Sequence, residues 1–187
     1  MKSIKTYHGL VNLEEIDKSF IIDIKYASDD NFIGKKLYPV NKCLLQLTTA
    51  RKLIASNNYA KSLGLRIKIL DAYRPLSIQK LMWDLLPDDN FVAPPTRGSK
   101  HNRGCAVDVT LTNIYGKELE MPSSFDDFSE KAWINYTCAQ KHKVENRELL
   151  AKIMLKSGFE RIKTEWWHFN DPEFANYPLL DIKLEDF

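Results

Sequence analysis

The sequence is poor in cysteine, and its three cysteines form no recognisable pair. Cys43, Cys105 and Cys138 are odd in number and lie far apart, and no CxxC motif occurs. A disulfide framework or a cysteine-rich zinc site shows paired or closely spaced cysteines. We therefore expect three reduced thiols, as in a protein of the cytoplasm.

Long hydrophobic runs and an excess of one charge are also lacking. No stretch approaches the roughly 18 apolar residues that a membrane span requires. The lysines near the N-terminus are not followed by the apolar segment of a signal peptide. The formal net charge is only +2, which argues against nucleic acid or an anionic membrane as a partner. We expect a cytoplasmic protein that binds neither nucleic acid nor a membrane. No feature of the sequence indicates an oligomeric state.

Internal repeats and low-complexity linkers are absent as well. The chain has 187 residues, and a chain of this size buries roughly 70% of its unfolded surface without needing a disulfide or a structural metal. We therefore predict one domain that spans residues 1–187.

Apolar periodicity and turn residues predict interspersed strands and helices. The predicted strands cover 20–26, 65–70, 106–111 and 159–169, and the predicted helices cover 47–63, 76–86, 128–138 and 146–156. Gly64 and Gly158 end two of the helices, and Pro87 ends a third. Because hairpin and crossover signals are weak, this order favours an α+β fold: a small, mainly antiparallel sheet with helices packed against it.

One segment places a histidine in a polar loop and an aspartate in an apolar strand. His101 lies in the stretch Ser-Lys-His-Asn-Arg-Gly over 99–104, and Asp108 follows seven residues after it. A carboxylate within a sheet is costly unless it is paired or bound to a metal. Strand parity directs Cys105 to the opposite face from Asp108, which excludes this thiol as a ligand. The alternative is an ordinary ion pair between Asp108 and Arg103.

A second segment, Thr-Glu-Trp-Trp-His-Phe-Asn over 164–170, places Glu165 three residues before His168. Zinc hydrolysis needs three protein ligands, an open position for water, and a base beside that water. His101, Asp108 and His168 supply the ligands for one zinc ion, and Glu165 supplies the base. A regular strand would direct Glu165 and His168 to opposite faces, so we expect a bulge or turn between them. The alternative is an aromatic core strand with an incidental acid. HExxH is absent, which excludes a helix-borne site.

Arg74 is the third candidate, at the end of a predicted strand and directly before Pro75. A guanidinium fixed there can donate hydrogen bonds to the oxyanion that forms when water adds to an amide carbonyl. A structural ion pair with Asp71 is the alternative. Each segment alone is weak, but together they predict a zinc peptidase whose site lies at strand ends.

These segments resemble the VanX-type D-alanyl-D-alanine dipeptidases, which belong to a zinc peptidase family that also contains D,D-carboxypeptidases. The family pattern SxHxxGxAxD is matched by Ser99, His101, Gly104, Ala106 and Asp108, ExxH by Glu165 and His168, and the arginine motif by Asp71-Ala-Tyr-Arg-Pro75. Further similarity covers 23–27, 31–34, 43–45 and 125–129, and therefore most of the chain. The segment 31–34 favours the dipeptidase branch.

The resemblance implies roles for these side chains. Zinc lies on His101, Asp108 and His168, Glu165 is the base, and Arg74 polarises the carbonyl. Ser99 and an acid of the 125–127 segment, Asp126 in preference to Asp127, receive the substrate's ammonium. Pro122 stands where the family pattern has glycine.

The implied reaction is hydrolysis of the D-Ala-D-Ala dipeptide to two D-alanines by metal-activated water, in glycopeptide resistance or in recovery of D-alanine. The alternatives are a D,D-carboxypeptidase or other cell-wall peptidase of the same fold, a zinc-binding module without activity, and a structural domain without metal. A zinc module should lack the base, and Glu165 is present.

Overall fold

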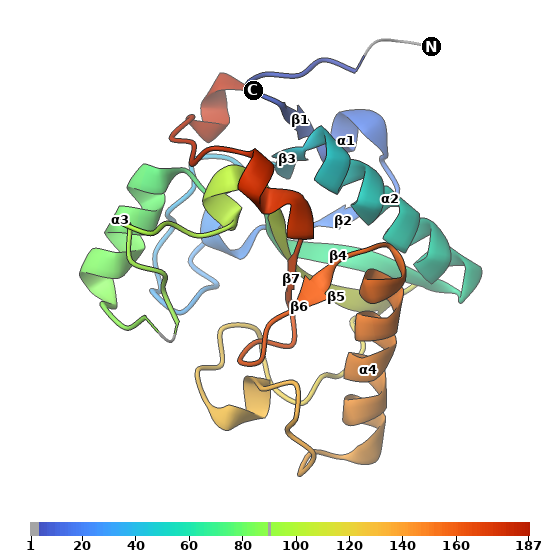
Figure 1. Ribbon diagram of the computed structural model, residues 1–187. Helices are drawn as coiled ribbons and strands as arrows, with labels where there is room; N and C mark the ends of the chain where they lie inside the picture. The colour runs from blue at the N-terminus through green and yellow to red at the C-terminus, as the bar shows by residue number, and fades with distance from the viewer. Residues whose placement is uncertain (1–3, 90) are drawn as a thin grey trace.

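The computed structural model describes residues 4–89 and 91–187, and a five-stranded sheet lies at its centre (Figure 1). In order across this sheet the strands are β2 (Ile21–Ile22), β4 (Leu65–Asp71), β5 (Ala106–Asn113), β7 (His168–Asn170) and β6 (Glu160–Arg161). β2 runs parallel to β4, and the other neighbours are antiparallel. Strands β1 (Leu10–Asn12) and β3 (Leu44–Gln46) form a separate antiparallel pair. The predicted α+β fold with a small, mainly antiparallel sheet is confirmed.

The α-helices within 4–89 and 91–187 are α1 (Leu13–Ile16), α2 (Leu47–Ser62), α3 (Leu76–Leu85) and α4 (Lys141–Lys156). The 3₁₀ turns are η1 (Lys25–Ala27), η2 (His101–Arg103), η3 (Glu130–Ala132), η4 (Pro172–Asn176) and η5 (Leu184–Asp186). α2 packs on β4 and α4, and α4 also contacts β5 and β6. In Figure 1, α3 stands on the opposite side of the molecule from α2 and α4. None of the helices within 4–89 and 91–187 has the length and apolar character to cross a membrane.

The hydrophobic core is one continuous cluster that runs from Leu10 near the start of the chain to Leu184 near its end. Alternate residues of β5, Val107, Val109 and Leu111, are fully buried in it. Because successive residues of a strand face opposite ways, this packing directs the intervening Asp108 to the other face of the sheet. Core packing on one face of β5 thus places Asp108 on the opposite face of the sheet.

Three of the predicted elements match the structure closely. The helix predicted over 47–63 is α2, the helix predicted over 76–86 is α3, and the strand predicted over 65–70 is β4. The predicted strand over 106–111 is β5, which continues to Asn113.

The single strand predicted over 159–169 is wrong. Two short strands, β6 and β7, pair with each other, with Glu160 opposite Asn170 and Arg161 opposite Phe169. Residues 162–167 between them form bends and irregular segments and belong to no strand. The aromatic content of this segment suggested a strand, but here the aromatic side chains pack from a turn: Trp166 and Trp167 are buried with their rings edge to face.

The helix predicted over 128–138 is also wrong, since only the turn η3 forms there. Asp127 Oδ1 accepts the backbone N–H of Ser129 at 2.8 Å, and Ser129 Oγ accepts the N–H of Lys131 at 3.3 Å. Such local side-chain acceptors compete with helical hydrogen bonds. The following helix begins at Lys141. Its start was predicted at residue 146, because the polar first turn shows no apolar periodicity.

The strand predicted over 20–26 is reduced to β2. The N–H of Ile24 donates to Asn41 Oδ1 at 3.0 Å, which takes this backbone group out of the ladder. The chain then turns into η1. Of the predicted strand, only Ile21 and Ile22 pair with β4.

Candidate metal centre and active site

Three ionisable side chains lie in a row across neighbouring strands. Asp71 at the end of β4 is opposite Asp108 on β5, and Asp108 is opposite His168 at the start of β7. Residues opposite each other in antiparallel strands point to the same face of the sheet. The register of β4 shifts between Ile69 and Asp71. This irregularity, with Leu70 as the extra residue, brings Asp71 opposite Asp108.

His101 reaches this row from the loop before β5. It begins the turn η2, which ends at Gly104 with a φ of 67°. A Cβ at this position would lie 2.5 Å from Leu10 Cδ2 and 3.1 Å from the backbone nitrogen of Gln46. Both the left-handed backbone and the lack of space therefore require glycine. The tight turn holds His101 over the sheet.

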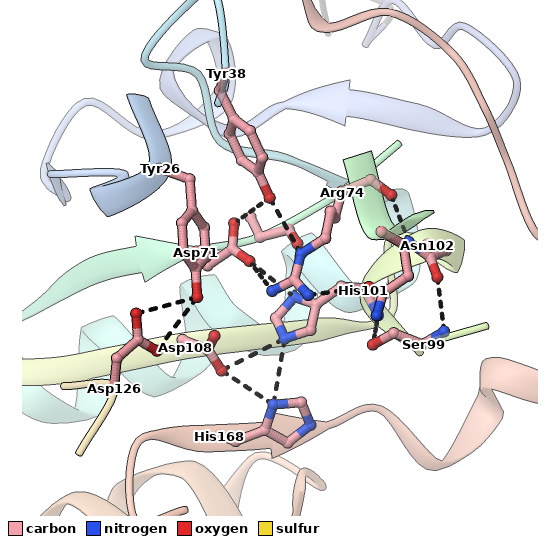
Figure 2. A network of polar contacts seen from close by, with 12 residues as sticks. Tyr26, Tyr38, Asp71, Arg74, Ser99, His101, Asn102, Asp108, Asp126 and His168 are labelled. Carbon is pink, nitrogen blue, oxygen red and sulfur yellow. Dashed lines mark hydrogen bonds and ion pairs between the residues drawn. The ribbon is translucent and has the colours of Figure 1, made fainter. Parts of the chain in front are cut away.

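Hydrogen bonds join the His101 loop to the end of β4. The N–H of Arg74 donates to the carbonyl of His101 at 3.1 Å. Asn102 Nδ2 donates to the carbonyl of Arg74 at 2.9 Å, and its Oδ1 accepts the N–H of Ser99 at 2.6 Å (Figure 2). These bonds hold the His101 imidazole and the Arg74 side chain in a fixed relation.

The structure brings together the three side chains predicted to bind zinc. His101 Nε2 lies 3.2 Å from His168 Nδ1. Asp108 Oδ1 lies 3.0 Å from His168 Nδ1 and 3.4 Å from His101 Nε2 (Figure 2). All three side chains are buried. Within 4–89 and 91–187 they are the one group of His, Cys, Asp or Glu side chains placed to hold a metal ion.

Both imidazoles have their outer nitrogen beside an oxygen acceptor. His101 Nδ1 lies 2.7 Å from the carbonyl of Ala72, and His168 Nε2 lies 2.8 Å from Asn170 Oδ1. Each outer nitrogen must carry the proton to donate to that oxygen, so each inner nitrogen presents a lone pair. Together with Asp108, the inner atoms are three facing acceptors that require a cation between them. Two imidazoles and one carboxylate form a donor set that fits Zn²⁺.

The protonation equilibria of the triad reflect the same need for positive charge. Burial lowers the pKa of His101, but the carboxylates of Asp108 and Asp71 together raise this pKa by more, so that it lies above its ordinary value. Burial raises the pKa of Asp108, but the neighbouring His101 and His168 hold it well below its ordinary value. In the metal-free protein both shifts therefore favour positive charge beside the Asp108 carboxylate.

A cavity of about 490 Å³ opens over the triad, and Glu165 lies in its wall. Glu165 Oε2 is 3.7 Å from His168 Nδ1. The two side chains face the same cavity because the chain turns between β6 and β7, as we predicted for this pair. Burial raises the pKa of Glu165 to about 7. A carboxyl group with a pKa near neutrality can take up a proton and return it.

Three side chains hold the buried guanidinium of Arg74. Its Nη2 forms an ion pair with Asp71 Oδ2 at 2.6 Å, its Nη1 donates to Gln79 Oε1 at 2.9 Å, and its Nε donates to the hydroxyl of Tyr38 at 3.3 Å (Figure 2). The structural ion pair that the sequence left open is thus present. These contacts engage three of the five N–H groups of a guanidinium. Because Arg74 also lines the cavity, the two N–H groups without a partner within 4–89 and 91–187 can donate to an oxygen atom there.

The two predicted substrate contacts, Asp126 and Ser99, line the same cavity but lie on opposite sides of the triad (Figure 2). Both carboxylate oxygens of Asp126 are 3.2 Å from the hydroxyl of Tyr26, and burial raises the pKa of Asp126 to about 7. The neighbouring Asp127 instead caps the turn at Ser129. The structure therefore places Asp126 at the cavity but does not bring it together with Ser99.

The competing interpretation of Asp108 is not supported. Arg103, its possible partner, donates from Nη1 to the carbonyl of Tyr177. Cys105 Sγ donates to the carbonyl of Arg103 at 3.4 Å and lies outside the triad.

Three polar side chains of the site were not predicted from the sequence: Tyr26, Tyr38 and Asn170. Tyr26 and Tyr38 are buried tyrosines whose acidic partners, Asp126 and Asp71, lie 100 and 33 residues away along the chain. No local signal identifies such contacts. Asn170 is different, because it lies two residues after His168 and so on the same face of one strand.

Comparison with known proteins places the chain among peptidases. Residues 6–184 match the model of the Peptidase_M15 family, described as D-Ala-D-Ala dipeptidase. The D-alanyl-D-alanine dipeptidase of Escherichia coli K12 is 40% identical over 178 residues, which are 95% of this chain and 92% of that protein. The enzyme of the same name from Enterococcus faecalis V583 is 32% identical, over 87% of this chain and 91% of its own.

The fold of the chain is similar to that of a solved structure. VanYB in complex with D-alanine-D-alanine superimposes with a TM-score of 0.50 and 16% sequence identity, over 73% of this chain and 76% of that one. At this identity the comparison concerns the fold alone.

Proposed function

The chain belongs to the D-alanyl-D-alanine dipeptidase family, and we propose that it is a zinc peptidase that hydrolyses the D-Ala-D-Ala dipeptide to two D-alanines. The observation that carries this proposal is the set of three facing acceptors on His101, Asp108 and His168, with the carboxyl group of Glu165 beside them in one cavity. This is the arrangement that metal-assisted hydrolysis needs: three ligands and a separate base.

We assign the chemistry to the chain's own side chains. His101, Asp108 and His168 would hold a zinc ion, which would supply Lewis acidity toward the scissile carbonyl and a water molecule. Glu165 takes the proton of the attacking water as the C–O bond forms, and delivers it to the amine nitrogen as the C–N bond breaks. Arg74 donates its free N–H groups to the oxyanion. The ion pair with Asp71 fixes the direction in which these N–H groups point.

Recognition of a dipeptide requires that the protein bind a free ammonium group close to the scissile bond. We propose that Asp126 accepts this ammonium, because it lies in the cavity wall while Asp127 is engaged in a turn. The hydroxyl of Tyr26 orients the Asp126 carboxylate. We assign Ser99 a separate substrate contact on the other side of the triad. Its Oγ already accepts the N–H of His101 at 3.2 Å, and its hydroxyl hydrogen can be donated to substrate.

Metal analysis combined with hydrolysis assays tests the proposal. The purified protein should hold about one zinc per chain and release D-alanine from D-Ala-D-Ala. It should cleave L-Ala-L-Ala and longer D-Ala-D-Ala peptides much more slowly. Hydrolysis of long peptides in preference to the dipeptide would identify a carboxypeptidase instead. A zinc-loaded protein with no hydrolysis of either would refute the enzymatic role.

We also propose that the protein is cytoplasmic and that residues 1–187 form one domain. Three free thiols, at Cys43, Cys105 and Cys138, support the location, and cell fractionation tests it. The continuous core from Leu10 to Leu184 supports the single domain. One cooperative unfolding transition, detected equally by far-UV and near-UV circular dichroism, is the expected result.

A further inference from the structure

Asn170 occupies a buried position directly behind one of the proposed metal ligands. It ends β7, opposite Ala106 on β5 and Glu160 on β6. Its exposed fraction is only 3%. Its Oδ1 lies 2.8 Å from His168 Nε2, on the side of the imidazole that faces away from the triad.

We propose that Asn170 is a positioning residue for the metal: by accepting the Nε2–H of His168, it holds the Nδ1 lone pair toward His101 and Asp108. This inference rests on the proposed metal site. The two imidazoles are supported differently. The outer nitrogen of His101 lies beside a backbone carbonyl, that of Ala72, which no substitution removes. The support of His168 is a side chain, so it can be removed selectively.

Loss of the amide oxygen would affect the ligand in two ways. The Nε2–H of His168 would be buried without an acceptor, which is costly. The energetic preference for the tautomer with a free Nδ1 lone pair would also disappear, because that preference comes from the acceptor at Nε2. Partners behind metal-bound histidines contribute to metal affinity in this way, and their removal typically lowers that affinity about 10–100-fold.

The side chain of Asn170 is a neutral amide, and its replacement by a carboxylate should affect zinc affinity. A carboxylate at this position would accept the same hydrogen bond and would also increase the electron density on the imidazole. Asn170→Asp should therefore bind zinc at least as tightly as the wild type. Asn170→Leu, of similar size but without an acceptor, should bind it 10–100-fold more weakly.

Zinc competition titrations against a chromophoric chelator, on the zinc-reconstituted full chain, provide the test. A matched control is Thr110→Val on the adjacent strand β5. The hydroxyl of Thr110 is buried and has no hydrogen-bond partner within 4–89 and 91–187, so its removal should leave zinc affinity unchanged. Weaker zinc binding by Asn170→Leu alone, restored in Asn170→Asp, is the expected pattern. Equal affinity of wild type and Asn170→Leu would overturn the inference.

The tautomer itself is measurable in the wild type, independently of any variant that fails to fold. Long-range ¹H–¹⁵N spectra of the zinc-loaded protein should show His168 protonated at Nε2 and metal-bound at Nδ1. The opposite tautomer would overturn the inference even if zinc and activity were present. A wild-type protein that binds no zinc would instead refute the proposed function, so the two failures are distinguishable.

Discussion

Glu165 is the residue whose proposed role is most easily separated from metal binding. It lies 3.7 Å from His168 Nδ1 but belongs to the cavity wall rather than to the triad. Glu165→Gln keeps the size of the side chain and removes the proton acceptor. We expect about one zinc per chain and a kcat reduced by about 10²–10⁴-fold, the usual contribution of general acid–base catalysis. Metal analysis and steady-state kinetics check this, and near-normal turnover would contradict the role of Glu165 as base.

The adjacent acids Asp126 and Asp127 offer a matched pair of variants. Asp126→Asn should raise KM for D-Ala-D-Ala, because a neutral amide cannot compensate the charge of the substrate's ammonium. Removal of such a charge-assisted hydrogen bond costs about 1.5–3 kcal/mol, or roughly 10–150-fold. Asp127→Asn should leave KM unchanged, since Asp127 caps a turn. The assignment fails if the two effects are reversed.

Arg74 has both a structural and a proposed catalytic contact, and substitution can separate them. Arg74→Ala should lower both kcat and the melting temperature, because it leaves the buried Asp71 without its ion-pair partner. Arg74→Lys keeps the charge but loses the planar fork. We expect it to retain most of the stability yet lower kcat, toward the 10²–10³-fold loss that removal of one oxyanion donor causes. A Lys variant with wild-type kcat and lowered stability would leave Arg74 with a structural role alone.

Among individual residues, the sequence predicted the side chains that belong to short motifs. It did not predict side chains that are distant in sequence and come into contact only in the folded protein. His101 and Asp108 are seven residues apart, and Glu165 and His168 are three residues apart. Each pair lies within a short motif of characteristic residues. Tyr26 meets Asp126 across 100 residues of chain. No periodicity or spacing encodes such a contact, since it depends on how the η1 turn and the 125–127 segment come together over the sheet.

Among the elements, the turn η2 depends most directly on one residue. Gly104→Ala combines a left-handed backbone with contacts of 2.5 Å to Leu10 and 3.1 Å to the Gln46 backbone. Gly158→Ala is the control, because its φ of +85° is also left-handed but nothing lies within 4 Å of the added Cβ. The control should lose about 1–2 kcal/mol. Gly104→Ala should lose more and also bind zinc more weakly, as His101 is displaced. Urea unfolding and zinc titration measure both, and equal losses in the two variants would contradict this role of the turn.

The elements that the sequence predicted well are those with internal signals. α2 ends at Ser62, shortly before Gly64, and α3 ends at Leu85, shortly before Pro87. β4 shows the alternation of a strand with one buried face. The prediction over 128–138 failed because Asp127 and Ser129 satisfy the backbone locally, which apolar periodicity does not reveal. The segment 159–169 failed for another reason: its two ends pair with each other, and such a return of the chain depends on tertiary packing of the tryptophans.

For the whole molecule, zinc should act as a cross-link between segments distant in sequence. The triad joins η2, β5 and β7, so metal removal should lower the melting temperature. A ligand at 100 times its Kd stabilises the folded state by about 2.7 kcal/mol. Differential scanning calorimetry with and without chelator at pH 7.5 measures this, and identical melting temperatures would contradict a site that forms only in the folded chain.

The stabilisation that zinc provides should decrease as the pH falls. Zinc binds the neutral imidazoles, so protons compete with it, and the competition is strengthened because the pKa of His101 is raised in the metal-free site. The stabilisation by zinc should therefore be larger at pH 7.5 and should shrink as the pH falls through mild acid. In the metal-free protein the proton on His101 contributes stability that is present at low pH and is lost as the pH rises through the raised pKa. Calorimetry at pH 5.5 and 7.5 checks both trends, and a chelator effect that grows toward acid would contradict them.

The hydrogen bonds between the His101 loop and the end of β4 bear on how such a site could be transplanted into another protein. The backbone N–H of Arg74 donates to the carbonyl of His101, and Asn102 Nδ2 donates to the carbonyl of Arg74. A designer who grafted only the HxxGxAxD segment would carry two ligands but lose the support behind His101, the carbonyl of Ala72. The smallest portable unit is therefore two strand ends with their loops, residues 71–74 and 99–108, moved as one rigid piece, with the β7 strand as the third component that the host scaffold must supply in register.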